Sequence, residues 1–276
     1  MSARDQSDAA RPVSLPAGSA LGPYRLLHPI APRRVDPERS EIWLAQAGQG
    51  RELVLKIYGT SVRTPMTLRR VRRESQLALR WAHLPAVVTT EFAGPIGDWW
   101  VIAMERLGPT LLEHHRERKD HQRRWRDSAT YTRWIEQIAR SLGEMHRAGN
   151  VHRDIKYQNI MLDPARSLAK LADFSRARRA GEGDHAPKSD QLELALVAWI
   201  LLTGRRYPAD PRHLLSAPLR QVLLRATAPR PSERFPDMAS FARALRAAAA
   251  ESASTGWTRR CRFPGVHRLR TLLRRS

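Results

Sequence analysis

Cysteine, lysine and long apolar runs are all scarce in this sequence. Cys261 is its one cysteine, so no disulfide and no cysteine-based zinc site can form within one chain, and we expect a reducing, cytoplasmic environment. The longest apolar run, from Leu194 to Leu202, is too short to cross a bilayer and is predicted to form a buried helix. The stretch from Met1 to Pro16 lacks the apolar core of a secretion signal.

Acidic residues are few relative to basic ones. The chain has 27 Asp and Glu residues against 48 Lys and Arg residues, which gives a formal net charge of +21. This charge predicts attraction to an acidic partner, such as nucleic acid, an anionic membrane or an acidic protein. The arginines are scattered along the chain, so a solvated arginine-rich surface explains the charge equally well. No recognised module for reading nucleic acid accompanies it.

Lysine supplies few of the basic residues. The five lysines are Lys56, Lys119, Lys156, Lys170 and Lys188. An ammonium is a compact charge on a flexible stem, and a guanidinium fork does not replace it. Lys56 ends an apolar segment and Lys156 follows an aspartate by two residues, so both are candidates for phosphate binding, although chance also explains two such positions.

The apolar pattern changes along the chain from strand-like to helical. Residues 1–22, rich in Ser, Ala, Pro, Asp and Gly, predict a disordered leader. The predicted strands span residues 24–30, 41–45, 52–58, 86–92 and 99–104. The predicted helices span residues 66–81, 128–147, 192–203 and 241–250. The helix over 128–147 is the best defined, because its apolar residues recur at spacings of three and four and Gly149 is placed to end it.

The segment from Val151 to Leu162 reads V-H-R-D-I-K-Y-Q-N-I-M-L and holds the chemistry of the chain. Asp154 can accept a hydroxyl proton, Lys156 can neutralise a transferring phosphate, and Asn159 can hold a metal ion through its amide oxygen. This spacing resembles H-R-D-x-K-x-x-N, the catalytic loop of the protein kinases, which is among the more specific short signatures. In that family a lysine two residues after the aspartate is typical of the serine/threonine class.

The resemblance extends to three further charged residues. Lys56 matches the family's strand lysine, and Glu74, 18 residues later in the next helix, matches its partner. Taken alone, Lys56 reads equally as a surface lysine and Glu74 as a partner for Arg70 or Arg73. Asp173, 19 residues after Asp154, opens D-F-S, which resembles D-F-G. The resemblance implies ATP held by Lys56, and Mg²⁺ held by Asn159 and Asp173.

The adenine pocket is also implied by the resemblance. The segment Met104-Glu105-Arg106-Leu107-Gly108 is similar to the hinge between the two kinase lobes, where backbone groups bond the adenine edge. Apolar residues before and after it would sandwich the ring, although each reads equally as plain core. The implied nucleotide-binding residues beside Lys56 and Glu74 are Ile42, Val54, Met104, Glu105, Leu107 and Met161.

Two parts of the sequence depart from the family pattern. The segment from Ala31 to Ser40, where a glycine-rich loop should cover the phosphates, contains no glycine. Only sixteen residues separate Asp173 from Asp190, the aspartate expected to brace the catalytic loop. That segment lacks a full A-P-E motif, with Lys188 in the place of the glutamate, and it contains no Thr or Tyr. Arg234, the expected partner of that glutamate, is left without one.

The resemblance implies an α+β, protein-kinase-like fold with two lobes. We expect a β-rich lobe over residues 23–105, a mainly helical lobe over 106–250 and a basic tail over 251–276. The expected activity is ATP- and Mg²⁺-dependent phosphorylation of serine and threonine in a protein substrate. The departures leave two alternatives open: a nucleotide-binding pseudokinase or scaffold, and a kinase for a small-molecule or lipid-headgroup hydroxyl.

The basic tail has two readings. From Thr255 onward it combines arginines with Trp257, Phe263 and leucines. It is interpreted either as a disordered tail or as an amphipathic helix that contacts an anionic membrane or an acidic partner. The second reading would place a cytoplasmic protein at the membrane periphery.

Overall fold

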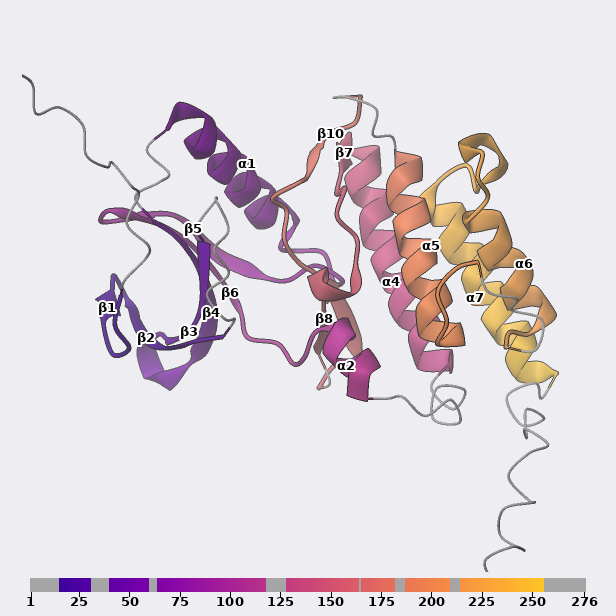
Figure 1. Cartoon of the computed structure of the whole chain (residues 1–276), viewed down its shortest axis with the longest axis horizontal. Coiled ribbons are helices and arrows are strands. Elements are labelled where there is room, and N and C mark those ends of the chain that lie inside the picture. Colours follow the sequence, from indigo (N-terminus) through magenta and orange to yellow (C-terminus); the bar gives the residue numbers. More distant parts are fainter. Residues whose placement is uncertain are drawn as a thin grey trace, which may run out of the picture.

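The computed structural model consists of a sheet-rich lobe and a helical lobe joined by one connection (Figure 1). It describes residues 15–30, 40–59, 64–117, 128–163, 165–181, 187–208 and 214–255. The predicted α+β, two-lobed architecture is therefore confirmed. The predicted glycine-free loop, most of the leader and nearly all of the basic tail lie outside the described residues.

One antiparallel sheet forms the first lobe, with its strands in the order β1-β2-β3-β4-β6-β5. The strands are β1 (Ala20–Leu21), β2 (Tyr24–Pro29), β3 (Ser40–Gln46), β4 (Glu52–Tyr58), β5 (Thr90–Ile96) and β6 (Trp99–Glu105). A short 3-10 turn, η1 (Gly48–Gly50), joins β3 to β4. Along β4, Leu53, Leu55 and Ile57 are buried in the lobe's core, so the period-two alternation of a strand turns Val54 and Lys56 to the opposite face.

The helix α1 (Pro65–Trp81) crosses the sheet of this lobe. It begins where Thr64 accepts a hydrogen bond from the Thr67 N–H, with a proline in its first turn, which is a favourable helix start. Its inward face buries Val71 against Tyr58 and Ile102 of the sheet, while Leu77, Ala78 and Trp81 near its end pack into the core of the second lobe. The same face carries Glu74, which places one carboxylate between helix and sheet.

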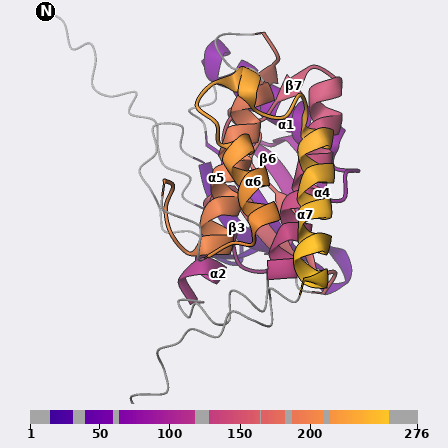
Figure 2. The ribbon, with the colours of Figure 1, turned by 90° about the vertical axis from the view of Figure 1, so that its right-hand side faces the viewer.

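The second lobe is a bundle of helices (Figure 2). Its helices are α2 (Leu111–Glu117), α4 (Ser128–Arg147), α5 (Pro187–Thr203), α6 (Ala217–Ala226) and α7 (Met238–Ser254), with the 3-10 turn η4 (Pro231–Glu233) before α7. The helix α4 packs against α5 and α7, and α6 packs against α7. The apolar run in α5 is buried on almost every side, as its composition predicts.

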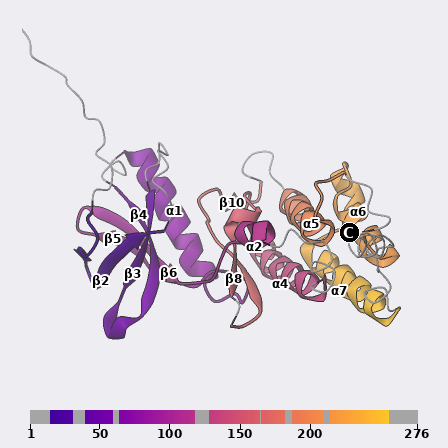
Figure 3. The ribbon, with the colours of Figure 1, turned by 60° about the horizontal axis from the view of Figure 1, so that its bottom comes forward.

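The short strands that follow α4 and precede α5 in the sequence lie where the two lobes meet (Figure 3). They are β7 (Asn150–Val151), β8 (Ile160–Asp163), β9 (Leu168–Leu171) and β10 (Arg178–Arg179), with η3 (Tyr157–Asn159) before β8. The strand β8 pairs with β9, and β7 pairs with β10. The predicted catalytic loop therefore runs between two small sheets that hold both of its ends.

Several predicted boundaries need correction. The leader was predicted to reach residue 22, but Ala20–Leu21 form β1 and Leu21 is buried against the sheet. The strand predicted over 86–92 begins only at Thr90, because Val87 and Val88 instead pair with Leu171 of β9. The last helix extends to Ser254, four residues into the predicted tail. In the part of the chain that the structure describes, no helix is long and apolar enough to span a membrane.

Candidate functional site

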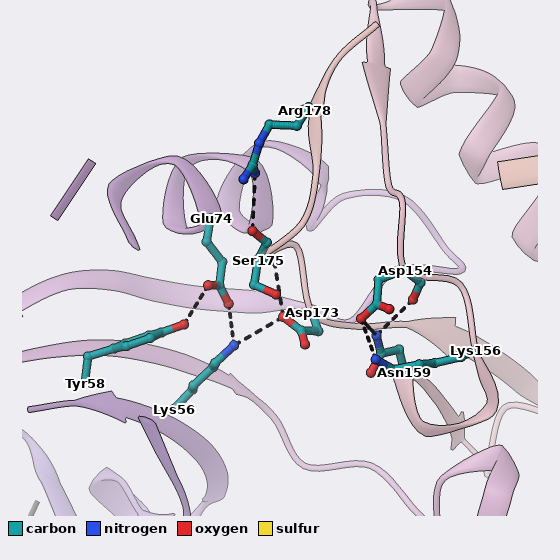
Figure 4. A network of polar contacts seen from close by, with 9 residues as sticks. All are labelled: Lys56, Tyr58, Glu74, Asp154, Lys156, Asn159, Asp173, Ser175 and Arg178. Carbon is teal, nitrogen blue, oxygen red and sulfur yellow. Dashed lines mark hydrogen bonds and ion pairs between the residues drawn. The ribbon is translucent and has the colours of Figure 1, made fainter. Parts of the chain in front are cut away.

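Lys56 lies at the centre of a charged cluster between the lobes (Figure 4). Its Nζ is 2.7 Å from Glu74 Oε1 on α1 and 3.2 Å from Asp173 Oδ1, which follows β9. Burial alone would lower the pKa of Lys56, but the negative charges of Glu74 and Asp173 and the nearby Tyr58 outweigh burial and hold this pKa well above its usual value. The lysine therefore stays cationic.

The carboxyl group of Asp173 is held in its ionised form. Burial alone would raise the pKa of its carboxyl, but the Lys56 ammonium and hydrogen bonds from Ser175 hold this pKa far below the usual range. The Ser175 N–H donates to Asp173 Oδ1 at 3.2 Å. The backbone of Asp173 is left-handed, with φ of 67°. Such strained residues occur at functional sites, where the surrounding structure fixes them.

The catalytic-loop residues form a second cluster on the other side of Asp173 (Figure 4). Asp154 Oδ2 accepts hydrogen bonds from Lys156 Nζ at 2.6 Å and from Asn159 Nδ2 at 2.8 Å. Asn159 Nδ2 also donates to the Asp154 carbonyl at 2.9 Å. The carboxylate is thus held in one orientation by an ammonium and an amide, and the three predicted residues act as one unit.

Asp190, at the start of α5, holds the backbone of this loop in place, as predicted. Its buried carboxylate accepts hydrogen bonds from the backbone N–H groups of His152 and Arg153, both at 2.8 Å, and lies 2.7 Å from His146 Nε2. Arg153 has a left-handed backbone, with φ of 69°. Two N–H bonds to one carboxylate fix the turn that Arg153 makes immediately before Asp154.

A cleft of about 1130 Å³ joins both clusters. All of the residues predicted to hold adenine lie along it: Ile42, Val54, Met104, Glu105, Leu107 and Met161. Lys56, Glu74, Asp154, Lys156, Asn159 and Asp173 line it as well. The structure therefore brings every predicted site residue to one cavity between the lobes.

The side chain of Glu105 has a different part from its neighbours in this list. Its Oε1 is 2.6 Å from Lys170 Nζ on β9 and accepts the Thr89 N–H at 2.7 Å. Both side chains are largely buried. This carboxylate ties the connection between the lobes to the second lobe, so a contact from Glu105 to a nucleotide would come from its backbone.

The residues implied for a magnesium ion fit its chemistry. Asp173 offers a carboxylate held anionic, and Asn159 commits its Nδ2 to Asp154, which leaves the amide oxygen as its free ligand atom. Mg²⁺ favours one or two protein oxygens completed by water and substrate phosphates. Among the described residues no group of three or more His, Cys, Asp and Glu side chains could hold a metal ion.

Sequence reasoning missed three contributors to the site. Tyr58 was interpreted only as a strand residue, yet its hydroxyl donates to Glu74 Oε2 at 2.6 Å. Lys170 pairs with Glu105, and Glu193 of α5 accepts the Ile155 N–H at 2.9 Å within the catalytic loop. The position of Tyr58, two residues after Lys56, was the available signal, because strand residues i and i+2 share a face.

Arg234 forms hydrogen bonds with backbone carbonyls in place of the glutamate that it was expected to pair with. Its guanidinium donates to the carbonyls of Ala228 and Lys188, both at 2.8 Å, and to that of Pro229 at 3.1 Å. The side chain is buried, and burial lowers its pKa.

Comparison with known proteins gives one consistent family. The model of the protein kinase domain matches residues 40–199. The serine/threonine-protein kinase pkn3 of Myxococcus xanthus is 29% identical over 140 residues, which are 49% of this chain and 25% of that protein. Protein kinase gsk3 of Schizosaccharomyces pombe is 49% identical over 45 residues, 16% of this chain and 12% of that protein. The chain thus spans a quarter or less of these curated relatives.

A solved structure shares the fold. The PknI kinase domain of Mycobacterium tuberculosis superposes with a TM-score of 0.64 at 24% identity, over 85% of this chain and 100% of the other. A C20A mutant of the same domain gives the same TM-score at 26% identity. The match covers both lobes, so it supports the architecture as a whole.

Proposed function

Because the chain belongs to the protein kinase family, we propose that it transfers the γ-phosphoryl group of ATP to serine or threonine hydroxyls of a protein. One observation carries the proposal: Lys56, paired with Glu74, and the Asp154 unit face one cleft with Asp173 between them. An enzyme that moves a phosphoryl group has mainly to position it and to neutralise its charge. Two ammonium groups and two anchored carboxylates along one cavity suit that task.

Each residue has a part in the proposed transfer. Lys56, steadied by Glu74, would bind the α- and β-phosphates. Asp154 would orient the acceptor hydroxyl and take its proton as the oxygen bonds to the γ-phosphorus. The bond from that phosphorus to the bridging oxygen breaks, and ADP leaves. Lys156 would release Asp154 in part to contact the γ-phosphate. Mg²⁺, when bound by Asp173 and Asn159, supplies further neutralisation of the phosphate charge.

Serine and threonine are the acceptors that the site supports best. Lys156 follows Asp154 by two residues, and pkn3 of Myxococcus xanthus, which matches over 140 residues, is named a serine/threonine-protein kinase. The adenine would lie between Val54 of the first lobe and Met161 of the second, both of which line the cleft. The connection from Met104 to Gly108 would supply backbone hydrogen bonds to its edge.

The test is transfer of labelled phosphate from ATP with Mg²⁺ to a generic basic protein and to the chain itself. The wild type is compared with Lys56→Met and Asp154→Asn, and with Asp98→Asn as a matched control, because Asp98 is an exposed acid in the turn between β5 and β6. We expect transfer by the wild type and by the control. Both site variants should lose roughly a hundredfold or more in rate.

Three other outcomes would contradict the proposal. Stabilisation of the protein by ATP on heating, with no transfer to any protein, would indicate a nucleotide-binding pseudokinase. Transfer that occurs only when small metabolites or lipid headgroups are added would indicate a different acceptor class. Equal transfer by wild type and Asp154→Asn would show that a contaminating kinase carries the activity.

A further inference from the structure

Glu74 is bonded through both of its oxygens to two residues of the same strand. Lys56 Nζ lies 2.7 Å from Oε1, and the Tyr58 hydroxyl donates to Oε2 at 2.6 Å (Figure 4). Lys56 and Tyr58 are two positions apart on β4, so their side chains leave the same face of the sheet and reach α1 together. The Lys56 ammonium also lies 5.4 Å from the centre of the Tyr58 ring.

The Tyr58 hydroxyl is a durable donor. Burial raises its pKa and the negative charge of Glu74 raises it further, which outweighs the opposing effect of Lys56. The hydroxyl therefore remains protonated throughout the pH range in which a protein works. A hydrogen bond from O–H to a carboxylate is among the stronger kinds, and this one removes the rotational freedom of the Glu74 carboxylate.

A second anchor lies directly across the sheet. Trp100 on β6 is the register partner of Tyr58. Its indole Nε1 donates to Ser75 Oγ at 2.8 Å, so the two cross-strand aromatic residues hold consecutive residues of α1. The Arg72 guanidinium lies 5.8 Å from the Trp100 ring centre, which adds a contact to the same helix. We call Tyr58 and Trp100 the aromatic clamp.

We propose that Tyr58 is a positioning residue for the nucleotide: through Glu74 it fixes the ammonium of Lys56, while Trp100 keeps α1 at the right place along the sheet. The inference rests on the proposed function, because it deepens the account of that site. It means that the pair between Lys56 and Glu74 is assembled by the first lobe itself. A tyrosine that merely filled the core would need its ring and not its hydroxyl.

The first test removes the hydroxyl alone. Tyr58→Phe is compared with Tyr24→Phe, because Tyr24 is a buried tyrosine of the same sheet that does not line the cleft. We expect Tyr58→Phe to raise the KM for ATP about tenfold, the loss of one hydrogen bond to a charged group, with a smaller change in kcat. Tyr24→Phe should leave both constants unchanged. An unchanged KM in Tyr58→Phe would overturn the proposal.

A double-mutant comparison separates positioning from packing. In a Glu74→Gln background the hydroxyl has no carboxylate to orient, so Tyr58→Phe should change kcat/KM by less than about twofold. A merely structural hydroxyl would have the same effect in both backgrounds, and that result would contradict the inference. Ser75→Ala and Trp100→Phe, measured singly and together, test the second anchor in the same way.

A readout without nucleotide distinguishes this inference from the proposed function. The rate at which an amine-acylating reagent modifies Lys56 is followed by peptide mass spectrometry. Loosening Glu74 should expose the ammonium, so we expect modification to accelerate about tenfold in Tyr58→Phe and not in Tyr24→Phe. Such acceleration without any phosphoryl transfer by the wild type would support the clamp and reject the kinase activity. An unchanged modification rate would reject the clamp even if the wild type is an active kinase.

Discussion

Replacing Asp190 by Asn should destabilise the protein in a pH-dependent way. The buried carboxylate receives the N–H groups of His152 and Arg153 and contacts His146. Asn keeps one oxygen acceptor, but its NH₂ group faces a donor where the second oxygen accepted. Breaking such a buried charged arrangement costs about 3 kcal/mol, which is a large part of a total stability of roughly 5–15 kcal/mol.

The pH dependence follows from the direction of the pKa shift. Burial alone would raise the pKa of Asp190, but hydrogen bonds and charge from His146 and His152 outweigh burial and hold this pKa below its usual value. The unfolded chain thus takes up the proton at a higher pH than the folded protein does. Above about pH 4 the Asp190 carboxylate makes its full contribution to the free energy of unfolding. This contribution is lost as the pH falls from there through the native pKa.

The assay is urea unfolding followed by tryptophan fluorescence, at about pH 7, about pH 5 and about pH 3.5. The difference in unfolding free energy between wild type and Asp190→Asn should be large at the first two values and smaller at the third. Asp237→Asn is the control, because Asp237 is an exposed cap that accepts one N–H from Ser240 at 2.6 Å. The control should lose less than about 1 kcal/mol. A difference for Asp190→Asn below about 1 kcal/mol at neutral pH would refute the reasoning.

Three further predictions concern other parts of the fold. Gly22→Ala should lower the unfolding free energy by about 2 kcal/mol and Gly97→Ala by about 1 kcal/mol. Both glycines have φ of +57°, but a Cβ at position 22 would lie 3.0 Å from Ile96 Cγ2, whereas a Cβ at position 97 would meet nothing within 4 Å. Equal losses in urea unfolding would contradict this. Lys170→Met should cost about 2 kcal/mol, because the Glu105 carboxylate would keep only the Thr89 N–H at 2.7 Å and the exposed Arg166 at 3.8 Å. Adding Glu105→Gln should restore part of that loss, and a fully additive double variant would count against the pairing. Phosphatase treatment should not change the rate of phosphoryl transfer, because the segment between Asp173 and Asp190 has no Thr or Tyr and its two serines, Ser175 and Ser189, are partly buried; a fall in rate that the kinase reverses with ATP would contradict this.

The elements with a strong local signal were predictable from sequence. The helix over Ser128–Arg147 was predicted with its observed bounds, because its apolar face repeats at helical spacing and Gly149 follows with φ of 75°. The catalytic-loop residues were predictable because Asp154, Lys156 and Asn159 lie within six positions, so their spacing survives folding as proximity. Asp173 and Asp190 were found only through the family resemblance, since no local pattern marks an aspartate that acts at long range.

The failures have a common physical reason. Val87 and Val88 look like strand residues, but the Val88 N–H donates to Leu171 of the other lobe and Val87 forms a bridge with the same residue, a partner that periodicity cannot identify. Tyr58 and Lys170 each lie in apolar strands, where an isolated polar group reads as exposed. Each is buried because a carboxylate from a distant element meets it. The sequence alone identifies Tyr58 and Lys170 as hydrogen-bond donors, but it does not identify the carboxylates of distant elements that accept from them.

The buried Arg234 is related to the short segment between Asp173 and Asp190, because that segment lacks the glutamate expected to pair with it. Backbone carbonyls satisfy the hydrogen bonds of Arg234 but do not neutralise its charge, so the helical lobe holds this residue without the ion pair that a glutamate at position 188 would form. The segment also offers no hydroxyl to phosphorylate between positions 176 and 188. Within the first lobe, the Tyr58 hydroxyl and the Trp100 indole hold Glu74 and Ser75, consecutive residues of the helix, while Leu77, Ala78 and Trp81 of the same helix pack into the apolar core of the second lobe.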